Sequence, residues 1–121
     1  MAKHYELGKR GEDIATEYLL KKNYTLLERN WRYKKAEIDI IAVKDNFLCI
    51  IEVKTRSSEH FGNPQDFVSR KKIGLLLKAV NEYIQQKDLD LEVRFDIIAI
   101  VKTDRNLKLE HLKNAFYYFD S

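Results

Sequence analysis

The chain has 121 residues, a net charge of +3 and a sequence pI near 8.9, with 45% hydrophobic and 34% charged residues. This composition argues against a disordered chain, and the length favours a single globular domain over residues 1–121. There is no apolar run that could span a bilayer, no apolar secretion signal at the start and only one cysteine, Cys49, which excludes an internal disulfide and a cysteine zinc cluster. We therefore expect a cytoplasmic protein.

The first half of the chain predicts one helix followed by three strands. Apolar residues recur at helical spacing over residues 5–22, and Asn23 is a suitable helix stop. The segments 25–31, 37–44 and 47–55 are typical of strands, and Asp45-Asn46 predicts a tight turn between the last two. The second and third strands are therefore expected to form an antiparallel hairpin.

The second half predicts a helix between two further strands and a loop. Residues 57–67 contain the only proline and are expected to form a loop, after which Ser69 caps a helix that runs to about residue 87. Residues 91–102 form a long strand, and residues 107–109 a short edge strand. Since the last long strand returns after a helix, the order predicts an α/β sandwich with a mixed sheet.

Two acids stand inside the most apolar strands. Asp39 interrupts the segment 38–43, and Glu52 interrupts the segment 47–53 and is followed by Lys54. An ionised carboxylate in a buried strand is costly unless a partner or a metal compensates it. These acids therefore predict either a structural ion network or a site that holds a cation and a negatively charged substrate.

The hairpin register makes this expectation specific. If Lys44 pairs with Phe47, Asp39 lies opposite Glu52, and Glu37 lies opposite Lys54, with all four side chains on one face. Directly opposed Cβ atoms are about 4.5–5.5 Å apart, so the two like charges repel unless a divalent cation lies between them. Mg²⁺ suits such a site, with Mn²⁺ as a substitute, because it takes one or two carboxylates and fills its other positions with water and phosphate oxygens.

These residues resemble a known nuclease signature. Asp39, a gap of twelve residues and then Glu52-Val53-Lys54 are similar to the metal-dependent pattern PD-(D/E)XK. Together with Gly11-Glu12 and the segments 37–42, 94–96 and 114–116, the ordered motifs resemble the YraN family over nearly the whole chain. That family is a bacterial group of predicted endonucleases, related in fold to archaeal Holliday junction resolvases.

The resemblance implies a three-layer restriction endonuclease-like sandwich with a central mixed β-sheet flanked by helices. It also implies a Mg²⁺-dependent endonuclease that cuts DNA, branched or single-stranded, by attack of metal-activated water. The roles it implies are metal binding by Asp39, Glu52 and the Val53 carbonyl, catalysis by Lys54, and a contribution through water from Glu12. Junction-cutting relatives work as dimers, so a homodimer is expected by analogy.

Alternatives remain open for several residues. Glu12 is either part of the site or a solvated residue on an amphipathic helix, and Glu37 either supports a metal ligand or only pairs with Lys54. Five basic residues either hold DNA phosphates or form a solvated surface: Lys35, Arg56, Arg70, Lys71 and Lys72. The aromatic tail 116–119 either closes the core or contacts a second copy.

Two other functions compete with the endonuclease. The first is a non-catalytic module that keeps the nuclease fold and binds nucleic acid or a protein partner. The second is an assembly protein that uses the aromatic tail and has no affinity for nucleic acid. No phosphate-binding glycine loop or calcium loop is found in the sequence.

Overall fold

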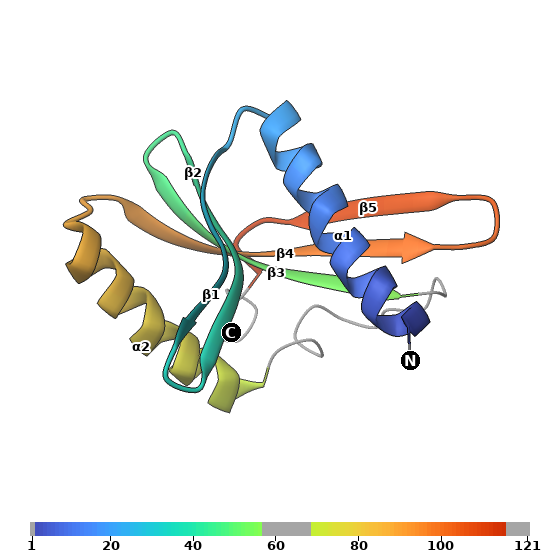
Figure 1. Cartoon of the computed structure of the whole chain (residues 1–121). Coiled ribbons are helices and arrows are strands. Elements are labelled where there is room, and N and C mark those ends of the chain that lie inside the picture. The colour runs from blue at the N-terminus through green and yellow to red at the C-terminus, as the bar shows by residue number, and fades with distance from the viewer. Residues whose placement is uncertain (1, 57–68, 116–121) are drawn as a thin grey trace.

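The computed structural model describes residues 2–56 and 69–115, which form two helices and five strands (Figure 1). In chain order these elements are α1 (Ala2–Lys21), β1 (Thr25–Tyr33), β2 (Ala36–Lys44), β3 (Phe47–Arg56), α2 (Arg70–Lys87), β4 (Glu92–Lys102) and β5 (Leu107–Leu112). The predicted loop 57–67 and the aromatic tail 116–119 lie outside the described residues.

The strands form one mixed sheet in the order β1-β2-β3-β4-β5. Neighbouring strands are antiparallel except β3 and β4, which are parallel. The parallel pair follows from the chain order, because β4 returns to the sheet after α2. This arrangement confirms the predicted mixed sheet.

The two helices cover opposite faces of the sheet (Figure 1). Buried residues of α2, including Leu76, Val80 and Tyr83, pack with Ile38 and Ile97 on one face. The other face packs against α1 through a second buried cluster, which contains Ala15, Leu19, Ile40, Ile51, Ile98 and Ile100. The chain therefore has the predicted α/β architecture of three layers, a sheet between two helices.

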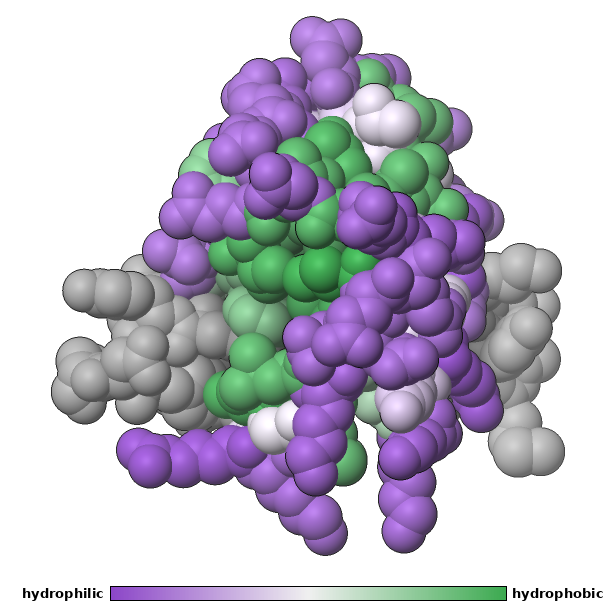
Figure 2. Space-filling view, turned by 90° about the vertical axis from the view of Figure 1, so that its left-hand side faces the viewer, coloured by the Kyte–Doolittle hydropathy of each residue, from purple (hydrophilic) through white to green (hydrophobic). Residues whose placement is uncertain are grey.

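One end of this sandwich is seen in Figure 2, which views the molecule from the left-hand side of Figure 1. Hydrophobic residues form a continuous area in the middle of this face, and hydrophilic residues border it. No helix in the described part of the chain is long and apolar enough to cross a membrane.

Several local expectations are confirmed. Asn23 ends α1 with a φ of 68°, and the next amide, that of Tyr24, donates to the Leu19 carbonyl at 3.0 Å. Lys44 pairs with Phe47 across the turn, as the two-residue connection requires. The Ser69 hydroxyl accepts a hydrogen bond from the Lys72 amide at 3.2 Å, which caps α2.

Strand β5 is longer than the predicted segment 107–109. It continues to Leu112 because every residue from Leu107 onward finds a partner on β4, ending with Leu112 opposite Ile97. The polar residues Glu110 and His111 in this stretch hide the strand from an analysis based on apolar residues.

Candidate active site

The side chains of β2 do not alternate regularly between the two faces of the sheet at Asp39. Ile38 packs on the face covered by α2, whereas Ile40 packs on the face covered by α1. Residues two apart in a regular strand share a face, so the strand is irregular at the residue between them. The break gives Asp39 a direction that a flat pleated strand would not provide.

At this irregular position the Asp39 side chain forms a hydrogen bond with the backbone of β3. The pairs between β2 and β3 run from Lys44 with Phe47 to Ile40 with Ile51, where they end. The Asp39 carboxylate then accepts a hydrogen bond from the Val53 amide at 2.8 Å. The predicted register is therefore confirmed up to Ile40, and beyond it the Asp39 side chain takes the place of a backbone acceptor.

Glu52 is buried, with 7% of its surface exposed, and two ammonium groups contact it. The Nζ of Lys54 lies 3.3 Å from its Oε1, and the Nζ of Lys72 lies 2.8 Å from the same oxygen. Glu52 and Lys54 share a strand face, as their spacing predicts. Lys72 comes from the first turn of α2, which the Ser69 cap fixes in place.

The electrostatic environment of Asp39 is unfavourable to its ionised form. Burial, and then the negative charge of Glu52, raise the pKa of Asp39 from 3.8 to about 7. The charge of Glu12 raises this pKa further, while the Val53 amide and the charge of Lys72 lower it. Asp39 is therefore repelled by both Glu52 and Glu12, and a bound cation would relieve this repulsion.

Glu12 joins the acids from α1. Its side chain is 21% exposed, and its Oε1 is buried without a hydrogen-bond partner in the described part of the protein. Burial raises the pKa of Glu12, opposed by a hydrogen bond from Asn30 and by the charge of Arg29. This is not the solvated glutamate of the alternative reading, since its carboxylate is turned toward the sheet.

Glu12 can approach the sheet because the preceding residue is a glycine. A Cβ on Gly11 would lie 2.0 Å from the Cγ2 of Thr55 on β3. Any side chain at position 11 would therefore push α1 away from the strand that carries Glu52 and Lys54. The absence of a side chain at Gly11 therefore lets α1 lie close to Thr55.

The expected pairing of Glu37 with Lys54 is wrong. Glu37 instead lies opposite Arg32 on β1, and its Oε2 is 2.7 Å from the Arg32 guanidinium. The physical reason is the break at Asp39, because Ile38 faces α2 and its neighbour Glu37 therefore projects toward the α1 side. Lys54 remains on the other face with Glu52.

The basic residues with predicted phosphate contacts lie in four places. Lys72 contacts Glu52, whereas Arg70 and Lys71 are exposed on the first turn of α2. We call Asp39, Glu52, Glu12 and the two lysines that contact Glu52 the acid site. Arg56 is exposed at the end of β3. Lys35 lies in the turn between β1 and β2 and lines a separate cavity of about 240 Å³ with Leu75 and Lys78 of α2.

The donors at this site fit a hard divalent cation. Within the described residues, no group of three or more histidine, cysteine, aspartate or glutamate side chains is arranged to hold a metal ion. Mg²⁺ needs only one or two carboxylates, and Asp39 and Glu52 supply two that interact electrostatically. The unbonded Glu12 Oε1 adds an acceptor that could receive a hydrogen bond from water at the site.

A second buried polar network surrounds Asp96. Its residues include members of the motif segments 94–96 and 114–116, for which the sequence predicted no contact. Asp96 is completely buried and accepts hydrogen bonds from Arg94, from the His111 ring at 2.7 Å and from the Asn114 amide at 3.0 Å. His111 also contacts the Tyr18 hydroxyl at 2.9 Å. The available signal was the same as for Asp39: an acid inside the very apolar strand segment 95–101.

The chain is similar to a family and to many bacterial proteins. The profile described as "Uncharacterised protein family UPF0102" matches residues 11–100. A UPF0102 protein of Flavobacterium psychrophilum is 61% identical over 98% of this chain and 100% of its own length. One from Christiangramia forsetii is 59% identical with the same coverage, and one from Phocaeicola vulgatus is 45% identical over 97% of both chains.

Proposed function

This chain belongs to the UPF0102 family, which is the YraN family, and from that premise we propose that it is a metal-dependent endonuclease acting on DNA phosphodiester bonds. The observation that carries the proposal is the buried pair Asp39 and Glu52, with Glu52 contacted by two lysines. Two interacting carboxylates favour a divalent cation, and neighbouring ammonium groups favour a phosphate.

Each side chain has a role in the proposed reaction. Asp39 and Glu52 would hold Mg²⁺ or Mn²⁺, with the Val53 carbonyl as a third ligand. The metal, when bound, would activate a water and neutralise charge that grows on the phosphate. Lys54 would orient the attacking water or stabilise the transition state through its ammonium group. Glu12, with its unbonded Oε1, would accept a hydrogen bond from water at the site.

Lys72 has a role that depends on the metal. In the structure its ammonium group offsets the charge of Glu52 at 2.8 Å. A divalent cation at Glu52 would repel this ammonium group, which lies on a long flexible side chain. We expect Lys72 to move from Glu52 to the negatively charged substrate when the metal binds.

The test is a cleavage panel with duplex, nicked, flap and four-way DNA in Mg²⁺ or Mn²⁺. We expect cleavage of at least one substrate, and a loss of about a hundredfold or more in rate for Asp39→Asn, Glu52→Gln and Lys54→Gln. The matched control is Glu110→Gln, which removes an exposed acid on β5 and should leave the rate unchanged. No cleavage of any substrate, or undiminished cleavage by the Asp39 and Glu52 variants, would reject the proposal.

A second candidate is a module that binds nucleic acid without cutting it. The favouring observation is that the ammonium groups of Lys54 and Lys72 lie close enough to Glu52 to offset its charge. Filter binding over a salt series separates the two functions, because phosphate contacts make affinity fall with salt. Tight, salt-sensitive binding in the absence of metal-dependent cutting would favour the module.

A further inference from the structure

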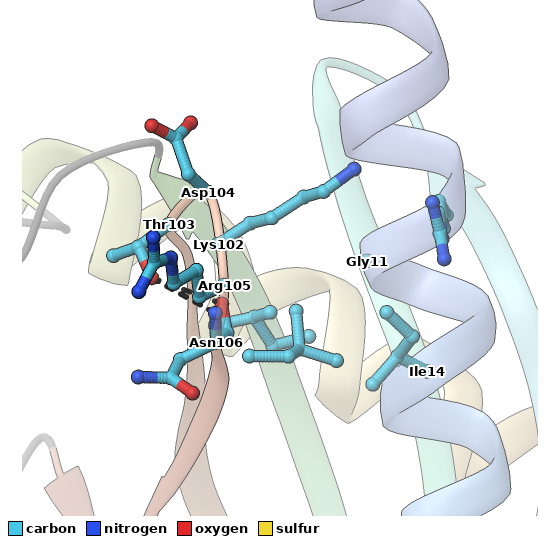
Figure 3. Close-up of a pocket in the computed structure, with 10 residues that line it drawn as sticks. Gly11, Ile14, Lys102, Thr103, Asp104, Arg105 and Asn106 are labelled. Atoms are coloured by element: carbon cyan, nitrogen blue, oxygen red, sulfur yellow. Dashed lines mark hydrogen bonds between the residues drawn. The ribbon is translucent and has the colours of Figure 1, made fainter.

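A hollow of about 220 Å³ lies between α1 and the turn that joins β4 to β5. Its apolar lining includes Ile14 of α1, which is labelled in Figure 3. Ile100 of β4 also lines it. Three cations line it: Arg10 from the helix, Lys102 from the end of β4, and Arg105 from the turn. We call this hollow the cationic pocket, and it is separate from the acid site.

The three cations of the pocket differ from other arginines of the protein in their contacts. Among the described side chains, those of residues 10–56 and 69–115, Arg10, Lys102 and Arg105 form no ion pair, whereas the arginines of β1 and Arg94 each contact an acid. Among the described residues that line the pocket, the single acid is Asp104. Figure 3 shows Lys102 extending toward α1, while Asp104 points outward from the tip of the turn. The pocket therefore attracts anions.

The turn that carries Arg105 is held by its own hydrogen bonds. The Thr103 amide donates to the Asn106 carbonyl at 2.9 Å, and the Asn106 amide donates to the Thr103 hydroxyl at 3.1 Å. These bonds fix the backbone between the two strands, so less conformational freedom is lost when an anion binds. The turn presents its cation from a defined position.

The cationic pocket adjoins the acid site through two elements. Gly11 lines the pocket, and the next residue of α1 is Glu12. Ile100 also lines the pocket, and it pairs with Thr55 on β3, the residue after Lys54. Neighbouring residues of α1 and β3 thus belong to the two places. Because Lys54 and Thr55 project from opposite faces of β3, a nucleic-acid strand that contacts both would pass around the end of β3, at Arg56.

We propose that the cationic pocket binds phosphodiester groups of the same nucleic-acid strand that occupies the acid site, beyond the bond to be cut. The proposal rests on the proposed function in that a nucleic acid is the ligand. Three cations from α1, β4 and the turn after β4, spread around a hollow of about 220 Å³, suit successive phosphates better than one small anion. Arginine and lysine supply the required donors.

The experiment measures binding of fluorescent single-stranded DNA by anisotropy in a chelator, so that no cutting occurs. The test variant combines Arg10→Gln, Lys102→Gln and Arg105→Gln. The matched control combines Lys21→Gln, Lys22→Gln and Lys87→Gln, which removes three exposed cations at the far ends of α1 and α2 (Figure 1). Both variants are first shown to melt like the parent.

We expect the test variant to bind the DNA about tenfold more weakly than the parent. The slope of log affinity against log salt concentration should also be smaller by about 2, because each phosphate contact on a single strand contributes about 0.7 to that slope and three contacts are lost. The control should change the affinity by less than about threefold. Equal losses in both variants would indicate a general charge effect and would overturn the proposal. Unchanged binding by the test variant, or no binding by the parent, would overturn it as well.

A second measurement distinguishes binding of a nucleic acid in the cationic pocket from binding of a small free anion. Amide NMR signals of Gly11 and residues 103–107 are followed during titration with inorganic phosphate, pyrophosphate or the DNA strand. Shifts with DNA that the test variant lacks support the proposal, whereas shifts with phosphate or pyrophosphate alone would reject it. Failure of the endonuclease proposal would appear differently, as absent cleavage with the pocket-dependent DNA binding intact.

Discussion

At the scale of single residues, Asp39 is the most consequential side chain. Burial and the charge of Glu52 raise its pKa from 3.8 to about 7, so that its ionised form opposes folding. The folded protein therefore binds a proton at Asp39 more tightly than the unfolded chain does. Its favourable contribution to stability is complete below pH 3.8 and is lost as the pH rises through about 7.

This pH dependence of stability predicts the effect of Asp39→Asn in metal-free buffer. The amide carries no charge, and its oxygen can still accept the bond from the Val53 amide. We expect the variant to be more stable than the parent above pH 7, by up to about 4 kcal/mol, at about 1.4 kcal/mol per pKa unit. The difference should shrink toward pH 3.8, where Asp39 is protonated in both states.

Urea unfolding at several pH values, with a chelator present, measures this difference. The control is Asp90→Asn, which neutralises an exposed acid and should show no such pH dependence. The free energy of unfolding of the Asp39 variant and that of the parent could instead differ by the same amount at every pH. That result would contradict a raised pKa of Asp39 in the folded protein.

At the scale of elements, the contact between α1 and β3 depends on Gly11. A Cβ at this position would meet the Thr55 Cγ2 at 2.0 Å. We expect Gly11→Ala to destabilise the protein by about 1–2 kcal/mol, because overpacking costs about 1–3 kcal/mol and better helix propensity returns at most about 1 kcal/mol. Displacement of α1 should also lower any cleavage rate, since Glu12 follows Gly11.

A double-mutant cycle tests this contact. Thr55→Ser removes the methyl group that the new Cβ would meet, so the double variant should be less destabilised than the sum of the single changes. Gly74→Ala is the matched control, because a Cβ there meets no atom within 4 Å. Strict additivity of Gly11→Ala and Thr55→Ser would show that this contact does not limit the packing of α1.

At the scale of the whole molecule, the Asp96 network joins segments that are far apart in the chain. It connects Tyr18 of α1 through His111 of β5 to Asp96 of β4, and Arg94 extends it to Tyr24. Burial opposes the charge of Asp96, but bonds from His111, Arg94 and the Asn114 amide outweigh it and lower its pKa. Its stability contribution is therefore present above pH 3.8 and is lost as the pH falls through the lowered value.

We expect Asp96→Asn to destabilise the protein by about 3–5 kcal/mol at neutral pH, because it leaves the Arg94 charge, whose side chain is only 12% exposed, without its anionic partner. The control Tyr18→Phe removes only a peripheral hydroxyl and should cost about 1 kcal/mol. Denaturant unfolding measures both, and acid unfolding of the Asp96 variant should be less steep than that of the parent. An Asp96 variant as stable as Tyr18→Phe would show that the network is not important for folding.

The sequence alone determined those structural features that depend on residues close together in the chain. The helix end at Asn23, the turn that pairs Lys44 with Phe47, the Ser69 cap and the shared face of Glu52 and Lys54 are all confirmed. These features depend on backbone geometry and on spacings of a few residues, which a sequence displays directly. The pairing of acids with a lysine in apolar strands likewise located the candidate site.

Only the tertiary structure decided which distant groups meet. The break at Asp39, the ion pair between Glu37 and Arg32, the arrival of Lys72 at Glu52 and the cationic pocket all involve elements brought together by packing. An irregular strand residue changes the direction of side chains without changing their spacing in the sequence. For that reason the sequence alone indicated the candidate residues, and the packing of the layers decided which of them lie together.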